Sequence, residues 1–241
     1  MKILLACPVL DIRYEWFLGF LNIWEQFRKR KNMDVGFYFP YRTPVHIADT
    51  EMVHEALKGN YDYILRMDDD IWDVPSDALE RLLAADKDFI SAVMYANSFP
   101  FQRCALVKKD KSRSLVDIAK SSSNECFEIN GEGIQPVDLT AFPFVLWKTS
   151  LFKKIPEPWF VYEPHVPTDN YFCQKCLDHG VQPHVDMNLQ VTHRGVTCWN
   201  RCYSLVAEGN HRIDMGLLKE DDQLYTAVKD VQSQLRKTNS L

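Results

Sequence analysis

The feature that most constrains this chain is the alternation of strand-like and helix-like stretches through its first part. Short apolar runs alternate with longer segments whose apolar residues recur every three or four positions, an order typical of a parallel sheet with crossover helices. We expect strands at 3–7, 35–39, 61–67 and 89–94. We expect helices at 14–30, 50–57 and 76–85, the last capped by Ser76. The sequence therefore predicts an α/β fold.

The second part of the chain has a weaker pattern. From 97 to 133 it predicts a variable, partly mobile insertion with short strands at 104–108 and 126–129. Further strands are expected at 137–147, 182–185 and 189–192, and further helices at 149–154 and 168–179, the latter closed by Gly180. We interpret residues 1–212 as one domain and residues 213–241 as a helical extension. The extension either packs on the domain or joins copies of the chain in a homo-oligomer.

The charge balance excludes some classes of partner. With 28 Lys and Arg against 33 Asp and Glu, the formal net charge is -5, so a broad basic surface for duplex nucleic acid is not expected. The apolar start, Met1–Pro8, is too short for a signal peptide or a transmembrane helix, and we expect a cytoplasmic protein. The aromatic helix 14–30 ends in the basic run Arg28–Lys31. Packing on a sheet explains its aromatic spacing better than a membrane contact does, but a peripheral membrane association stays open.

Seven cysteines are scattered through the chain, an odd number that does not suit a disulfide framework. Cys173 and Cys176, and Cys198 and Cys202, have short spacings of the kind found in zinc sites. One hypothesis is therefore a zinc-stabilised binding module without enzymatic activity. The other is that Cys173 and Cys176 are reduced core residues, because they fall inside an amphipathic helix pattern.

The most informative residues are Asp68, Asp69 and Asp70, which directly follow the apolar stretch 61–67. In open α/β sheets ligands bind beyond the carboxyl ends of the strands. Strand alternation predicts that Asp68 and Asp70 face one way and Asp69 the other. Clustered carboxylates favour a divalent cation, and Mg²⁺ or Mn²⁺ is usually held together with substrate phosphates. The alternative is an acidic turn without a ligand.

The stretch Tyr63–Ile71, followed by Pro75 and the helix 77–83, resembles the DxD strand, loop and helix of the GT-A fold glycosyltransferases that use nucleotide-diphosphate sugars, especially family 2 and its small phage and bacterial relatives. Three other segments are similar to that family in the same order: 6–9, 137–155 and 168–195. The resemblance implies a single GT-A domain with a mostly parallel central sheet flanked by helices. It divides that domain into a nucleotide-binding half, 1–95, and an acceptor-side half, 96–212.

The resemblance also implies a metal site. Asp70 would bind Mn²⁺ or Mg²⁺ directly, Asp68 would support the ribose or the metal, and His193 would complete the coordination. A divalent cation stabilises the negative charge that develops on the departing nucleotide diphosphate. His193 also has a plainer interpretation, as a structural histidine that serves as a hydrogen-bond partner.

Roles for other residues follow from the same resemblance. Asp169 matches the general base of inverting members, although Thr168 stands where the family commonly has Glu, and Asp169 could equally cap its helix. The remaining residues divide between the two substrates. Expected contacts with the donor come from Pro8, Val9, Asp68, Asp69 and Arg194, and expected acceptor-side residues are Asp138 and Trp199. Arg194 either reaches the diphosphate or forms a surface ion pair, and packing explains Trp199 equally well.

These expectations combine into one leading hypothesis, a metal-dependent glycosyltransferase. It would move a sugar from a nucleotide-diphosphate donor, with UDP favoured, to an acceptor hydroxyl with inversion. The sequence does not identify the acceptor. A nucleotidyltransferase with the same fold lacks support, because the glycine-rich, basic phosphate loop that it needs near the first strand is absent. The zinc-stabilised binding module remains the non-enzymatic alternative.

Overall fold

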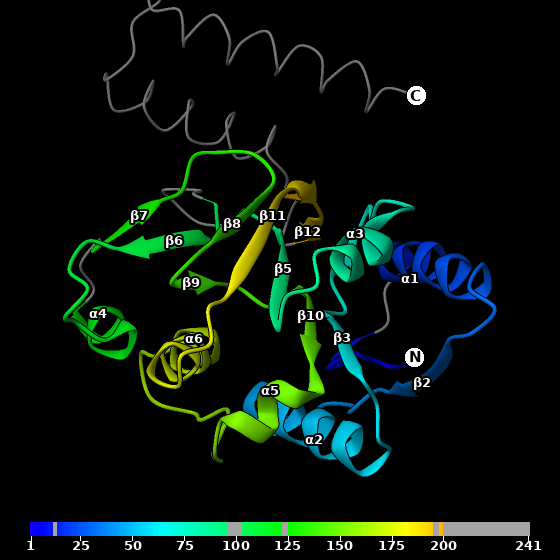
Figure 1. Ribbon diagram of the computed structural model, residues 1–241, viewed down its shortest axis with the longest axis horizontal. Coiled ribbons are helices and arrows are strands. Elements are labelled where there is room, and N and C mark those ends of the chain that lie inside the picture. Colours follow the sequence, from blue (N-terminus) through cyan, green and yellow to red (C-terminus); the bar gives the residue numbers. More distant parts are fainter. Residues whose placement is uncertain (12–13, 96–102, 122–124, 195–197, 200–241) are drawn as a thin grey trace, which may run out of the picture.

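A seven-stranded sheet forms the centre of the molecule in the computed structural model, which describes residues 1–11, 14–95, 103–121, 125–194 and 198–199 (Figure 1). Its strands lie in the order β2-β1-β3-β10-β5-β11-β8. Their bounds are Lys2–Ala6 (β1), Asp34–Tyr38 (β2), Tyr63–Met67 (β3), Phe89–Val93 (β5), Ile134–Pro136 (β8), Phe144–Lys148 (β10) and His184–Gln190 (β11). β10 runs antiparallel between β3 and β5, and β8 runs antiparallel to β11. The other five strands share one direction, so the predicted mostly parallel sheet is confirmed.

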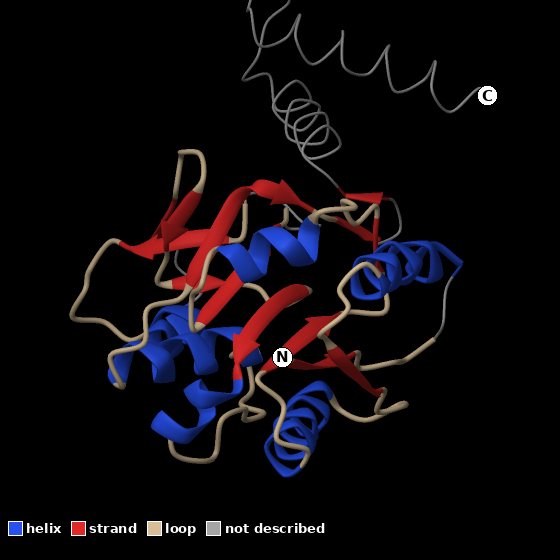
Figure 2. Ribbon diagram, turned by 45° about the vertical axis from the view of Figure 1, so that its right-hand side comes forward, coloured by secondary structure: helices blue, strands red, loops and turns tan. Residues whose placement is uncertain are grey.

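Helices cover both faces of this sheet (Figure 2). One face carries α1 (Tyr14–Arg28) and α3 (Ala78–Ala84), and the other carries α2 (Val45–Lys58), α5 (Thr149–Lys154) and α6 (Thr168–Asp178). In β1, Ile3 and Leu5 point into the core on the side of α1 and α3, while Leu4 and Ala6 point into the core on the side of α2, α5 and α6, as strand alternation requires. Strands buried on both faces read as continuous apolar runs, which is why the sequence pattern was clear here.

Two small sheets and one further helix complete the described fold. One sheet has the order β7-β6-β9 and the other β13-β12-β4. Their strands are Ile71–Trp72 (β4), Ala105–Lys108 (β6), Cys126–Glu128 (β7), Leu139–Thr140 (β9), Thr192–Arg194 (β12) and Cys198–Trp199 (β13). The helix α4, Leu115–Ser121, lies against α6. Among the described residues, no helix is both long and apolar enough to cross a lipid bilayer.

Several predicted boundaries in the first half are wrong. α2 begins at Val45, well before the predicted start at residue 50, because Pro44 supplies the helix start. α3 begins at Ala78 with Asp77 in the capping position, so Ser76 is not the cap; the Asp77 side chain makes no capping hydrogen bond, and Gln26 Oε1 accepts from the Leu79 amide instead. Gly180, by contrast, follows α6 with φ of +71°, a conformation that favours glycine, as predicted.

The second half differs more from the prediction. The stretch 137–147 is two strands in different sheets, and the stretches 182–185 and 189–192 are largely one strand, β11, with an irregularity after Asp186. The part of 97–133 that the structure describes contains α4, which the sequence analysis missed. The predicted extension 213–241 and any homo-oligomer contact through it lie outside the described residues. The division into 1–212 and 213–241 therefore stays a prediction.

Candidate active site

Three aspartates form a tight turn where β3 ends. Asp68, Asp69 and Asp70 directly follow Met67, and the chain returns as β4 at Ile71. The Ile71 amide donates a hydrogen bond to the Asp68 carbonyl over 3.3 Å, and all three aspartates are partly exposed. The expectation from strand alternation does not apply here, because the strand ends at Met67. The turn, and not the pleat of the strand, sets the direction of each carboxylate.

Asp69 fixes the loop that follows β1. Its Oδ2 accepts hydrogen bonds from the backbone amides of Leu10, over 2.6 Å, and Asp11, over 2.9 Å. Pro8 and Val9, the residues expected to contact the donor, therefore lie in a loop that is tied to the aspartate turn. In this arrangement Asp69 has a structural role, because it holds the loop after β1 in place.

The same loop is also tied to the end of β2. The Val9 amide donates to the Pro40 carbonyl over 2.9 Å, and the Arg42 amide donates to the Val9 carbonyl over 2.8 Å. The carboxyl ends of β1, β2 and β3 therefore meet at one edge of the sheet. This edge is where ligands bind in open α/β folds.

A buried arginine, Arg66 in β3, lies directly behind the aspartate turn. Its Nε donates to Asp49 Oδ1 of α2 over 2.7 Å, and its Nη1 lies 2.8 Å from Asp68 Oδ1. The same Nη1 donates to the Phe142 carbonyl over 2.6 Å. The side chains of Arg66 and Asp49 are 3% and 0% exposed. One guanidinium thus joins α2, the turn and the segment before β10.

Burial and pairing shift the pKa values of Asp49 and Arg66 in this network. Burial raises the pKa of Asp49 above its ordinary value, and the Arg66 guanidinium opposes that rise. Burial alone would lower the pKa of Arg66, but the Asp49 and Asp68 carboxylates outweigh it and raise the pKa above its ordinary value. Asp49 Oδ2 is buried with no hydrogen-bond partner among the described residues. Arg66 is therefore the residue that stabilises the ionised form of the buried Asp49.

Asp169 lies in the first turn of α6 and is partly buried. Its Oδ1 accepts a hydrogen bond from the Asn170 amide over 2.9 Å. The helix-capping position belongs to Pro167, so Asp169 is not the cap itself, although it binds a first-turn amide. Burial raises the pKa of Asp169 to about 6, against the lowering effect of these amides and of Arg66, while Asp68 raises it further. Asp169 and the arginine network are thus within electrostatic reach of each other.

The predicted metal-binding histidine is brought beside the aspartate turn by strand pairing. The backbone of His193 in β12 pairs with Ile71, the residue directly after Asp70. On its other side His193 pairs with Trp199, and Arg194 pairs with Cys198 in β13. The topology therefore brings the segment after the aspartate turn, β4, together with β12 and β13, which lie far from it in the sequence. The side chains of His193, Arg194 and Trp199 are outside what the structure describes.

Asp138, the predicted acceptor-side aspartate, is buried beside the small sheet β7-β6-β9. Its Oδ2 accepts a hydrogen bond from the Lys108 amide over 2.7 Å and pairs with the Lys111 ammonium. These contacts hold the end of β6 in place. They give Asp138 a structural role, and its role toward an acceptor stays a prediction.

Of the four cysteines in the zinc hypothesis, the structure describes the side chains of Cys173 and Cys176, and these do not support it. Both belong to α6 and are buried in the apolar core, and burial raises the pKa of both thiols. A zinc ligand must be a thiolate, which such a site disfavours. Cys202 and the Cys198 side chain lie outside the described part. Among the side chains that the structure describes, no three His, Cys, Asp or Glu come together in an arrangement that could hold a metal ion.

Sequence reasoning missed Arg66 and Asp49. The signal for Arg66 was present, since an arginine inside the apolar strand Tyr63–Met67 must be paired if that strand is buried. Nothing in the sequence singles out Asp49 as the partner, because the pair forms only when α2 packs on β3.

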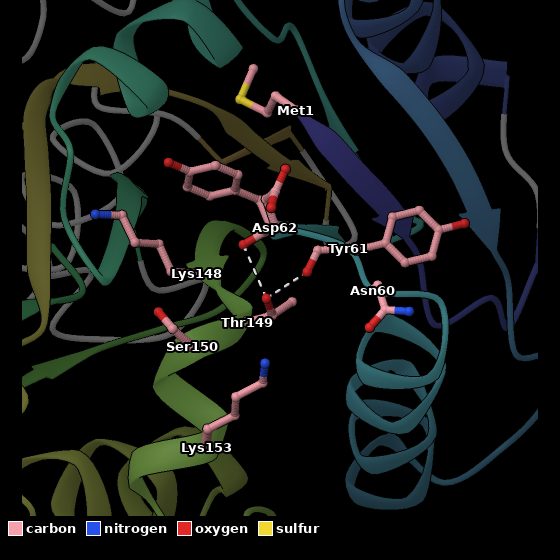
Figure 3. A pocket seen from close by; sticks show the side chains of 9 residues that line it. Met1, Asn60, Tyr61, Asp62, Lys148, Thr149, Ser150 and Lys153 are labelled. Atoms are coloured by element: carbon pink, nitrogen blue, oxygen red, sulfur yellow. Dashed lines mark hydrogen bonds between the residues drawn. The ribbon is translucent and has the colours of Figure 1, made fainter.

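A separate polar cavity lies elsewhere in the protein. It has a volume of about 620 Å³ and lies at the end of the sheet where β3 begins (Figure 3). There the Thr149 hydroxyl donates to the Tyr61 and Asp62 carbonyls over 2.5 and 3.2 Å. The five residues of β3 span about 16 Å. The cavity is therefore separate from the aspartate turn at the other end of that strand.

The sheet order and the helices on both faces define an α/β fold of the GT-A (Rossmann-like) type, with a mostly parallel central sheet. The fold that the sequence resemblance implied is thus confirmed. No protein-family model matches the sequence, and no curated protein matches it.

Similarity to solved structures is extensive in coverage and low in identity. A197 from STIV matches 81% of this chain and 86% of its own at 16% identity, with a TM-score of 0.54. A Drosophila β-1,4-galactosyltransferase 7 mutant, in complex with manganese, UDP-Gal and xylobiose, matches 84% of this chain and 72% of its own at 15% identity, with a TM-score of 0.46. A UDP-glucose pyrophosphorylase matches 80% and 93% at 9% identity, with a TM-score of 0.47. At these identities the likeness concerns the fold alone.

Proposed function

We propose that this protein is a metal-dependent glycosyltransferase that moves a sugar from a nucleotide-diphosphate donor, UDP-linked by preference, to an acceptor hydroxyl with inversion. One observation carries the proposal. The aspartate turn holds the loop after β1 through Asp69 and pairs with the buried Arg66 through Asp68, at the carboxyl edge of the sheet. That edge is the ligand-binding edge of open α/β folds.

The chemistry of the turn fits a hard divalent cation. Asp68 and Asp70 supply carboxylate oxygens, the ligand type that Mg²⁺ and Mn²⁺ prefer. Arg66 pairs with one Asp68 oxygen, so Asp70 is the proposed direct ligand. His193, whose backbone pairs with Ile71, is the proposed third ligand. A cation held there would stabilise the charge that develops on the departing diphosphate.

Asp169 is the proposed general base. Its pKa of about 6 leaves the carboxylate ionised at neutral pH and makes it more basic than an ordinary aspartate. In this role the carboxylate takes the proton of the acceptor hydroxyl while the hydroxyl oxygen attacks the anomeric carbon. The departing nucleotide diphosphate leaves from the opposite side, which inverts the configuration.

The remaining predicted residues keep their roles as part of the proposal. Pro8, Val9, Asp69 and Arg194 would contact the donor within a nucleotide-binding half, 1–95, completed by β12. Asp138 and Trp199 would lie on the acceptor side, within 96–212. We also propose a cytoplasmic setting, and the five described cysteines, all free thiols, are consistent with a reducing compartment.

The products of the reaction test this function. Purified protein is incubated with UDP-sugars, pyrophosphate and Mn²⁺, and release of UDP and consumption of pyrophosphate are measured separately. The glycosyltransferase releases UDP, slowly when water is the acceptor, whereas a nucleotidyltransferase running in reverse consumes pyrophosphate and releases a nucleoside triphosphate. Consumption of pyrophosphate without release of UDP would overturn the proposal.

Matched variants locate the base. Asp169→Asn should abolish UDP release and leave donor binding intact, since the amide keeps the hydrogen bond from Asn170 but cannot accept the proton. Asp178→Asn, at the exposed end of the same helix, is the control and should retain full activity. Full turnover by Asp169→Asn would exclude Asp169 as the base.

A further inference from the structure

The outer side of α1 exposes a row of large apolar side chains. The inner side of this helix is buried through Trp16, Ile23 and Phe27. The outer side still carries large apolar residues, and Tyr14 is 73% exposed. The others on the helix, between 36% and 46% exposed, are Phe17, Leu18, Leu21 and Trp24. A helix that is apolar on both sides needs a partner for its outer side.

Aromatic residues of the edge strand β2 continue this surface. Phe37 lies 5.7 Å from Trp24 and 6.1 Å from Phe20 between ring centroids, and Phe39 lies 6.0 Å from both Phe37 and Trp16. Phe37 and Phe39 are themselves 42% and 40% exposed. The rings therefore form one continuous layer across α1 and β2. In Figure 1 these two elements lie together at one side of the sheet.

The surface extends from there to the loops of the candidate active site. Tyr41 and Leu10 are 60% and 65% exposed, and both belong to the loops joined at Val9. An apolar recess of about 470 Å³ opens between the loops and α1. It is lined by Val9, Trp16, Phe17, Phe20, Phe39 and Tyr41. We call the exposed side chains of α1, β2 and these two loops the aromatic face.

The size of the aromatic face is unusual for a surface in contact with water. Aromatic side chains carry about 150–250 Å² each, so its six exposed aromatic residues leave on the order of 600 Å² uncovered. The largest apolar patch on a typical monomer is about 300–600 Å². The three exposed leucines of the face increase this area further. Such a patch marks a site of interaction with a protein or a membrane.

Basic residues follow directly at the end of α1. Arg28 and Lys29 are exposed, and Lys31 is exposed in the turn to β2. Arg28 pairs with Glu25 and Arg30 with Glu80, while the described residues give no ion pair to Lys29 or Lys31. Unpaired lysines beside aromatic and aliphatic side chains are the combination by which interfacial helices bind anionic lipid.

We propose that the aromatic face docks on the surface of a bilayer that contains anionic lipid. The aromatic and leucine side chains would enter the boundary between headgroups and acyl chains, and Lys29 and Lys31 would lie among the headgroups. The chain would then lie on the membrane with the loops of the candidate active site beside it. This proposal does not depend on the transferase activity, because binding to lipid can be measured without turnover.

The charge next to the face is what favours lipid over a second copy of the chain. In a symmetric contact between two copies the apolar side chains would cover one another, and such a contact gives no reason for the exposed Lys29 and Lys31 beside the face. An anionic headgroup layer pairs with the basic run and accepts the apolar side chains in a single contact. The apolar recess of about 470 Å³ beside Trp16 could hold part of a lipid acyl chain.

Vesicle flotation of the full chain tests the proposal. Vesicles of phosphatidylcholine with 30 mol% phosphatidylserine, a composition of about physiological surface charge, should carry the protein upward. Pure phosphatidylcholine vesicles should carry on the order of tenfold less, and added salt should weaken binding to the anionic vesicles. No flotation with the anionic vesicles would overturn the proposal.

Paired variants separate the aromatic face from other surfaces. Leu18→Ser with Leu21→Ser should lower partitioning on the order of tenfold or more. Val45→Ser with Ile47→Ser changes residues of similar exposure on α2, across the sheet, and should change nothing. Lys29→Ala with Lys31→Ala should lower partitioning by a factor of about 5 for each lysine, whereas Lys153→Ala on α5 should not.

A second measurement separates lipid from protein as the partner. Sedimentation velocity across a range of concentrations should show the same oligomeric state for the native chain and for Leu18→Ser with Leu21→Ser. Self-association that is lost in this variant, together with absence of flotation, would assign the aromatic face to a contact between copies and overturn the lipid proposal.

Discussion

Replacing Arg66 by Met should destabilise the protein strongly and in a pH-dependent way. The substitution leaves Asp49, which is fully buried and already has one oxygen without a partner, with no positive charge beside it. Breaking a buried pair in this way costs about 3–5 kcal/mol. For a chain of this length each kcal/mol lowers Tm by about 2–4 °C, so Tm should fall by about 10 °C at pH 7.

The loss of stability in Arg66→Met should grow as the pH rises. Burial raises the pKa of Asp49 in the folded state, and removing Arg66 removes the main opposing influence. A carboxyl group whose folded pKa is raised loses stability as the pH rises above its unfolded pKa, because the unfolded chain releases the proton more readily. The Arg66→Met variant should therefore be closest to the native protein near pH 4 and furthest from it near pH 7.

Urea denaturation followed by circular dichroism at pH 4.5 and pH 7 measures both effects. Arg66→Met combined with Asp49→Leu should recover much of the loss, since no buried charge remains. Arg28→Met is the control, because Arg28 and its partner Glu25 are 64% and 53% exposed, and it should cost less than half as much. A loss below 1 kcal/mol at pH 7, or equal losses in the single and the double variant, would refute this account of the network.

Other predictions concern separate parts of the chain. Donor hydrolysis should fall as the pH drops through about 6, where Asp169 takes up a proton, and a pH–rate profile with no limb near 6 would exclude Asp169 as the group that titrates. Asp169→Asn should raise the free energy of unfolding at pH 7 by about 1–2 kcal/mol, because a folded pKa raised to about 6 makes the ionised carboxylate destabilising above that pH; urea titration checks it. Ser114→Ala should cost about 1 kcal/mol, since the Ser114 hydroxyl accepts from the Asp117 amide over 3.0 Å at the start of α4, and an unchanged urea midpoint would contradict it. Gly180→Ala should cost about 1 kcal/mol because of the φ of +71° at this position, and Gly131→Ala is the control.

The sequence predicted the parts of the fold that local patterns determine. β1, β3 and β5 are buried on both faces, so their apolar runs stand out, and the predicted bounds differ from the observed ones by only a few residues. The antiparallel position of β10 between β3 and β5 could not be predicted from its own residues, because a buried strand reads the same in either direction.

The missed helix α4 had a local signal. Ser114 and Asp117 form a capping pair, with the Ser114 hydroxyl 2.7 Å from Asp117 Oδ2, in the pattern that marks helix starts. The surrounding polar residues concealed it, since only Leu115 and Ile118 are buried. Short helices with two buried residues have too little periodicity to be recognised with confidence from sequence.

The candidate site divides in the same way. The aspartate turn was visible because a strand ended in three carboxylates, whereas Asp169 was singled out only by the family resemblance. The partnership of Arg66 with Asp49 was not visible, since it joins a helix and a strand that meet only in the folded protein. Likewise the exposure of Phe17 and Trp24 could not be separated from core packing until the inner and outer sides of α1 were known.

Metal-dependent binding of a nucleotide diphosphate tests the central claim most directly. Thermal-shift measurements with UDP, GDP, CDP and dTDP, with and without Mn²⁺, report any ligand that binds only the folded state. We predict a shift with UDP that requires Mn²⁺ and is lost in Asp70→Ala but retained in Asp73→Ala. No shift with any nucleotide in the presence of Mn²⁺ or Mg²⁺, from protein that unfolds cooperatively, would contradict the proposed function.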